Sequence, residues 1–318
     1  MKGAGYPRFP MRRYVITAAA ALAAAGLTVG LTLATRTTPP KPHTQAGRPP
    51  LVLDFGVRTD PEAVALRRAA NLYDGGKAEQ AAPVFRRYRS LEAEIGSALT
   101  DWPGGFGDLA ALARAHPRSS LVQLAYGLAL YWRGDQAGAE EAWRTARTAQ
   151  PDTPYALRAE DLLHPNFPRG LPNFVPSFLP PPALARLSPP RQLDYLRAHA
   201  TDVRGKLLYG VALQRLGQQL SALKEFEAAA ALAPEDAEPK VAVAVGRFDK
   251  ADPSRTFSRL GPLAKQYPRS QSVRFHLGLS LLWLGSVKKA KEELRLARDA
   301  GPRTPLGTEA RRFLERLP

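Results

Sequence analysis

The sequence predicts an all-α fold, in which helix-turn-helix repeats form a superhelix that is internally duplicated and follows one N-terminal transmembrane helix. Three observations support this prediction. Three stretches of the chain repeat one set of residues, in which a Gly is followed by a second Gly after 7 residues, an Ala after 12 and a Pro after 24. A longer match pairs the segment from His116 to Leu162 with the segment from Tyr267 to Leu314. Residues 14–35 contain no charged side chain.

The repeated residues have a physical explanation in helix packing. Gly inside a helix costs about 1 kcal/mol relative to Ala, so a recurrent Gly indicates that a second helix approaches closely. The second Gly is expected to take the left-handed conformation that ends the first helix, and the Pro to follow the second helix. The members are Gly127, Gly134, Ala139, Trp143 and Pro151, then Gly210, Gly217, Ala222, Phe226 and Pro234, then Gly278, Gly285, Ala290, Leu294 and Pro302.

This pattern resembles the tetratricopeptide repeat, a 34-residue helical hairpin with a Gly, Ala, aromatic and Pro signature. We expect a further unit at 62–95 and a degenerate unit at 237–270. In the degenerate unit, Gly261-Pro262 should interrupt the second helix. A helix at 308–317 should cap the stack at its C-terminal side.

These features predict six consecutive regions. They are a cytoplasmic basic tail (1–13), a transmembrane helix (14–35), a Pro-rich tether (36–59), a first repeat block (60–165), a Pro-rich apolar linker (166–202) and a second repeat block with the C-terminal capping helix (203–318).

The 22 uncharged residues of 14–35 can span about 30 Å of hydrocarbon as a helix. Four basic residues and the terminal amine precede this run and three basic residues follow before residue 51, which favours a cytoplasmic N-terminus. We therefore expect a single-pass protein of a bacterial plasma membrane with an extracytoplasmic repeat domain. A cleaved secretory signal is the alternative, although its apolar region is normally shorter, about 7–15 residues.

The net charge of +16 is unevenly distributed. Residues 62–165 hold 12 basic and 13 acidic residues, whereas residues 203–318 hold 21 basic and 12 acidic residues. The second block could therefore meet an anionic surface, with a simple solvated face as the alternative. Nucleic acid is not expected as a partner, because no aromatic and basic recognition motif accompanies the charge.

Nothing in the sequence indicates catalysis, a cofactor or a metal. The chain has no Cys, and its five His residues lack metal-ligand spacing. It also lacks a Gly-x-Ser-x-Gly motif and a complete phosphate-binding loop. We therefore expect a protein that is not an enzyme.

The family resemblance implies that the first helices of successive units line a concave groove that binds a protein or peptide. The candidate groove residues are Leu124, Leu128, Tyr131, Trp132, Leu207, Val211, Gln214, Arg215, Phe275, Leu279, Leu282 and Trp283. These residues are mostly apolar, which favours a partner with an apolar or Pro-rich segment, although ordinary core packing explains the aromatic pairs equally well.

The linker contains an apolar segment of its own. Residues 164–190 hold nine Pro, together with Phe174 and Phe178. An exposed apolar segment of this size would favour aggregation, so we hypothesise that both Phe side chains dock on the repeats, at the junction of the two copies or near Trp132. The alternative is an exposed arm that binds a partner.

Taken together, these features favour a membrane-tethered interaction scaffold at the cell envelope. The alternative is a structural or self-assembling envelope component without a distinct client.

Overall fold

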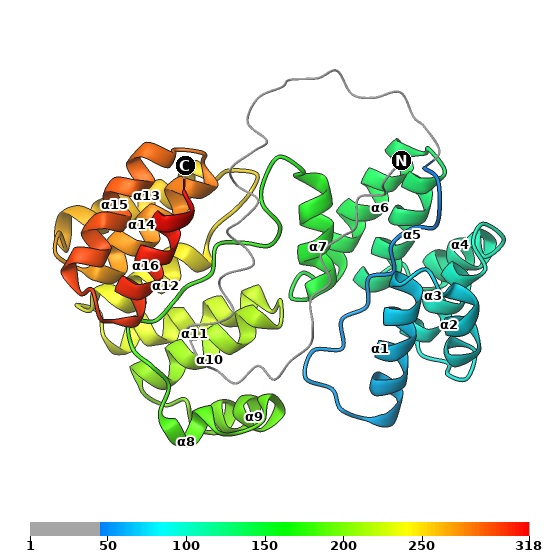
Figure 1. The fold of residues 1–318 in the computed structure, drawn as a ribbon, viewed down its shortest axis with the longest axis horizontal. Helices are drawn as coiled ribbons and strands as arrows, with labels where there is room; N and C mark the ends of the chain where they lie inside the picture. The colour runs from blue at the N-terminus through cyan, green and yellow to red at the C-terminus, as the bar shows by residue number, and fades with distance from the viewer. Residues whose placement is uncertain (1–44, 318) are drawn as a thin grey trace.

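The computed structural model describes residues 45–317, and this part of the chain contains sixteen α-helices and no strand (Figure 1). The predicted basic tail (1–13), the predicted transmembrane helix (14–35) and the start of the tether lie outside the described residues. None of the helices within 45–317 is both long and apolar enough to cross a membrane.

Seven helices form the first block and seven form the second, with two helices between them. The first block contains α1 (Pro61–Asp74), α2 (Ala78–Phe85), α3 (Leu91–Thr100), α4 (Phe106–Ala115), α5 (Ser120–Trp132), α6 (Gln136–Ala149) and α7 (Pro154–Leu163). The predicted linker contains α8 (Pro182–Ala185) and α9 (Pro189–His199). The second block contains α10 (Val203–Arg215), α11 (Gln219–Leu232), α12 (Ala237–Gly246), α13 (Ser254–Gln266), α14 (Gln271–Trp283), α15 (Val287–Ala300) and α16 (Pro305–Arg316).

Each block is three helical hairpins followed by one single helix. The first helices of the hairpins contact one another and then the single helix, in the order α1, α3, α5 and α7, and in the order α10, α12, α14 and α16. The single helices begin alike, since Thr153 caps α7 and Thr304 caps α16 through the side-chain oxygen, each just before a Pro. The described residues thus have the all-α fold of helical hairpins that the sequence predicts, and the two blocks share one order of hairpins and single helix.

The repeated Gly and aromatic positions pack as the spacing predicts. A Cβ on Gly278 would lie 2.9 Å from Leu294 Cγ, and a Cβ on Gly210 would collide with the ring of Phe226. Both Leu294 and Phe226 are fully buried. The second glycines also adopt the expected left-handed conformation, with φ of 86° at Gly134, 73° at Gly217 and 71° at Gly285.

The predicted interruption at Gly261-Pro262 is wrong, because α13 runs through both residues. Pro262 removes a donor to the carbonyl of Ser258, but both residues are exposed, so water can satisfy that carbonyl. On the opposite face of α13, Thr256 and Leu260 are buried. Burial of this face holds the helix together despite the Pro.

Candidate functional site

The predicted groove residues are enclosed rather than open to solvent. Tyr131 and Trp132 are half-buried and Arg215 is exposed, while the other nine are buried: Leu124, Leu128, Leu207, Val211, Gln214, Phe275, Leu279, Leu282 and Trp283. Leu279 and Trp283 form a cluster with Phe248, against which Phe167 and Leu171 of the linker pack. The linker therefore covers the inner face of the second block.

The covering segment, residues 171–178, is here called the second strap. It is extended, and Figure 1 shows the linker running from α7 across the second block to α8. Two consecutive backbone N–H groups of the strap donate to side chains of the block. The N–H of Phe174 donates to Gln214 Oε1 on α10 at 3.1 Å, and the N–H of Val175 donates to His276 Nε2 on α14 at 2.9 Å. The groove thus recognises the backbone of the strap.

Phe174 is the main apolar contact of the second strap. Its side chain is 1% exposed and lies between two rings. It stacks on His276 at 5.1 Å between ring centroids and meets Phe226 edge-on at 5.4 Å. Burial lowers the pKa of His276 to about 4, so the ring is neutral near pH 7. In that state Nδ1–H donates to the carbonyl of Ser272 and leaves Nε2 free to accept from Val175.

Glu238, on α12, holds the far end of the second strap. Its carboxylate accepts from both the N–H and the hydroxyl of Ser177. Burial raises the pKa of Glu238, and the two hydrogen bonds from Ser177 oppose that shift. Three successive inner helices therefore each supply one acceptor: α10, α12 and α14.

The docking hypothesis for the linker holds for Phe174, but the contact lies in the groove of the second block and not near Trp132. Phe178 is half-buried at the edge of the same core, with the guanidinium of Arg204 over its ring at 5.0 Å. The two Phe side chains therefore differ in burial, which the sequence did not predict.

A comparable segment, residues 48–57, lies against the first block and is here called the first strap. It is the end of the predicted tether, and its Leu51 and Phe55 are both 6% exposed. Tyr73 on α1 donates its hydroxyl to the carbonyl of Pro49 at 2.6 Å. Arg48, at the start of the strap, donates to the carbonyl of Thr100 at the end of α3 at 3.2 Å.

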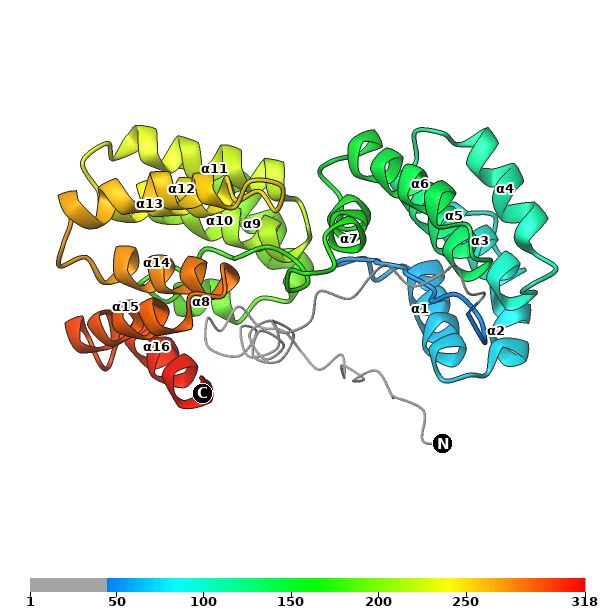
Figure 2. The same ribbon diagram turned by 90° about the horizontal axis from the view of Figure 1, so that it is seen from above.

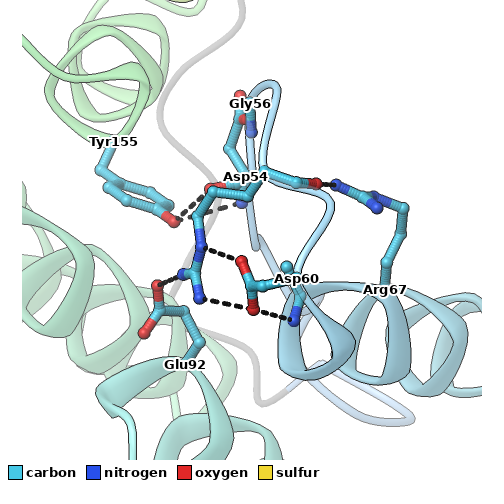
Figure 3. A network of polar contacts seen from close by, with 8 residues as sticks. Asp54, Gly56, Asp60, Arg67, Glu92 and Tyr155 are labelled. Atoms are coloured by element: carbon cyan, nitrogen blue, oxygen red, sulfur yellow. Dashed lines mark hydrogen bonds and ion pairs between the residues drawn. The ribbon is translucent and has the colours of Figure 1, made fainter. Parts of the chain in front are cut away.

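The C-terminal part of the first strap is held by the polar network in Figure 3. The hydroxyl of Tyr155, on α7, accepts from the N–H of Asp54 at 3.2 Å and donates to its carbonyl at 3.0 Å. Burial raises the pKa of Tyr155 to about 12, so the phenol stays protonated. Arg58 then joins Asp60, which caps α1, to Glu92 on α3. Both blocks therefore hold an extended segment of chain that precedes them in sequence.

The two blocks touch at α7, the helix of the first block that faces the second block (Figure 2). Asp152, just before α7, accepts from the N–H groups of Leu220 and Ser221 at 2.7 and 3.2 Å and so caps the N-terminus of α11. A Cβ on Gly217 would lie 2.7 Å from Pro154, which shows how closely the α10–α11 turn approaches α7.

A buried ion pair also joins the blocks. Lys250 follows α12, and its side chain is 0% exposed. Its Nζ lies 2.6 Å from Asp161 Oδ1 on α7 and donates to the carbonyl of Pro168 at 3.0 Å. Asp161 Oδ1 also accepts from the N–H of Gly170 at 2.8 Å. This pair fixes the start of the linker next to α7.

No protein-family model matches the chain, and no curated protein matches its sequence. The chain is similar to three solved structures in particular. For yeast Tom70 the TM-score is 0.31 at 14% identity, covering 80% of this chain and 53% of that one. For the Cut9–Hcn1 hetero-tetramer of APC/C the TM-score is 0.29 at 13% identity, covering 80% and 55%. For the TPR2AB domain of yeast Sti1, in complex with pHSP90, it is 0.28 at 12% identity, covering 80% and 97%. This chain thus spans about half the length of the first two.

Sequence reasoning missed part of the strap site. The sequence pattern places Gln214 in the groove but assigns no binding role to Glu238 or His276. A polar residue recurring on the inner helices of one block was the available signal, because a buried Gln or His needs a partner that the helix itself does not supply.

Proposed function

We propose that this chain is a membrane-tethered repeat scaffold that binds an extended segment of another protein at the cell envelope and catalyses no reaction. The second strap is the observation that carries this proposal. The inner face of α10, α12 and α14 holds an extended, Pro-containing segment through side-chain acceptors and an aromatic slot. A surface with these properties suits an apolar, Pro-containing protein segment.

Membrane tethering is supported by the 22 uncharged residues of 14–35 and their basic flanks. If the segment is a retained anchor, the protein stays with membranes after carbonate washing, and protease added from the outer side cleaves residues 51–318. Recovery of a soluble chain that begins near Thr35 would instead identify a cleaved signal.

Site-specific photo-crosslinking in native membranes tests the scaffold role. Leu179 directly follows the second strap and is 62% exposed, so a photoreactive residue there samples proteins that bind beside the strap. The matched control position is Glu292, which is exposed on α15. We expect one client protein to be captured from position 179 and not from position 292. Capture of only a second copy of this chain at 179 would favour the self-assembling alternative.

We further propose an anionic surface as a second partner of the second block. Exposed basic side chains on or beside α15 and α16 support it: Lys288, Lys289, Arg295, Arg303 and Arg311. Vesicles that contain anionic lipid should bind the full chain more weakly as salt rises, since the screening length falls to about 8 Å at 0.15 M. Changing these five residues to Gln should remove the salt-dependent part of the binding, and an unchanged affinity would leave the charge as a solvated face.

A further inference from the structure

The contacts of the second strap do not depend on its covalent link to the block. Its backbone N–H groups at Phe174 and Val175 donate to side chains of α10 and α14, and the ring of Phe174 lies between Phe226 on α11 and His276 on α14. A separate peptide of the same sequence could make every one of these contacts. The groove is therefore formed by the block, and the strap is its occupant.

The strap can also leave without separating the blocks. Two contacts fix the chain before the strap begins: the carbonyl of Pro168 accepts from Lys250, and the N–H of Gly170 donates to Asp161. Lys250 and Asp161 are in turn paired with each other. At the other side, α8 begins at Pro182, four residues after the strap ends. The capping contact of Asp152 with α11 involves neither end.

We propose that the groove over α10, α12 and α14 is a binding site in which the second strap competes with a client, and that the client supplies an extended segment with a Phe, a β-branched residue and a Pro in succession. This rests on the proposed scaffold function. Gln214 and His276 select a segment with free backbone N–H groups at the Phe and the next residue. Glu238 selects a residue with hydrogen-bond donors at the position of Ser177, which is the third residue after the Phe.

Competition with the second strap lowers the observed affinity of the groove for a free segment. A strap tethered by a short linker has an effective concentration in the millimolar range, so a free segment of equal intrinsic affinity is outcompeted. Weakening the strap should therefore strengthen binding of a free segment. Truncating a buried Phe should shift this competition on the order of 100-fold or more.

The probe is a fluorescent peptide with the sequence of residues 170–179, measured by anisotropy against the purified full-length chain. We expect little binding to the wild type and binding on the order of 100-fold tighter to Phe174→Ala. The matched control is Phe55→Ala, which truncates the first strap instead and should bind no better than the wild type. A peptide with Ala in place of its first Phe should bind none of them.

Equal binding of the peptide to the wild type and to folded Phe174→Ala would overturn the proposal. If Phe174→Ala fails to fold, a milder variant, Ser177→Ala, takes its place. It removes only the hydrogen bond from the Ser177 hydroxyl to Glu238. That variant should then bind the peptide roughly tenfold tighter than the wild type, and an unchanged affinity would again overturn the proposal.

The experiments distinguish failure of the scaffold proposal from failure of the proposed competition between strap and client. If crosslinking captures a client but the strap-weakened variants bind no peptide, the competition mechanism is rejected and the scaffold stands. If the variants bind the peptide but no client is captured, the scaffold role is rejected. A concentration-dependent doubling of mass of the wild type would assign the groove to a second copy of this chain and overturn the client part.

Discussion

Replacing Asp161 by Asn should destabilise the folded chain by about 3–5 kcal/mol. The change leaves the ammonium group of Lys250 in place with a side chain that is 0% exposed, and removes the carboxylate that lies 2.6 Å away. The carbonyl of Pro168 and the ring of Trp283, with its centroid 5.7 Å from Nζ, remain as contacts, but neither carries the opposite charge. An uncompensated buried charge is among the most costly single changes in a protein.

Thermal unfolding of the full chain measures this effect. At about 2–4 °C per kcal/mol for a structure of this size, the expected fall in Tm is roughly 6–20 °C. The matched control is Asp194→Asn, which breaks an exposed pair with Arg197 and should cost less than about 1 kcal/mol.

A double variant that removes both charges distinguishes the effect of losing the ion pair from the effect of leaving one buried charge without its partner. Replacing the pair with Lys250→Met and Asp161→Leu should recover most of the stability, because a well-packed apolar pair often equals a buried ion pair. The reasoning is refuted if Asp161→Asn lowers Tm no more than Asp194→Asn. It is also refuted if the double variant is no more stable than the single one.

Three further changes probe the strap and the repeat. Phe174→Ser should lower Tm far more than Phe178→Ser, because only Phe174 is fully buried; equal losses would contradict this. Since the pKa of His276 falls from 6.5 to about 4 on folding, the unfolded chain binds that proton more tightly, and unfolding free energy should drop by about 3 kcal/mol as pH falls from 6.5 to 4. His276→Gln should flatten that slope in urea titrations, whereas exposed His199→Gln should not. Gly210→Ala should cost about 1–3 kcal/mol by overpacking, and a neutral effect in the same titration would refute the close approach.

The sequence predicts the hairpins well because their contacts are local. Gly210 and Phe226 are 16 residues apart and face each other within one hairpin, so their spacing directly reports the contact. The left-handed turn at Gly217 is equally local, because only the backbone of one residue decides it.

The site depends on contacts that spacing does not encode. The N–H of Val175 meets His276 across 101 residues, and Ser177 meets Glu238 across 61 residues. The composition of the linker shows that it must be covered, but not which block covers it or in which register. Helix α13 shows why a local pattern can mislead. The predicted interruption rests on Pro262 alone, whereas the burial of Leu260 that keeps the helix intact depends on neighbouring helices.

The straps extend the arrangement that the two blocks share, which is here called a unit. Each unit consists of an extended segment, three hairpins and a single helix, and the strap contributes to the core of the hairpins it precedes. In the first unit Leu51 and Phe55 belong to that core, and in the second unit Phe174 and Val175 do. A partner of the proposed scaffold would therefore meet inner helices that a strap already covers. Such a partner would either displace a strap or bind to another surface. Side chains of the blocks hold both straps: the phenol of Tyr155 binds both backbone groups of Asp54, and Gln214 and His276 accept from the N–H groups of Phe174 and Val175. We assign the proposed exchange with a client to the second block, because its strap lies between the contacts of Pro168 and Gly170 on one side and helix α8 on the other, so it can leave while both ends stay in place.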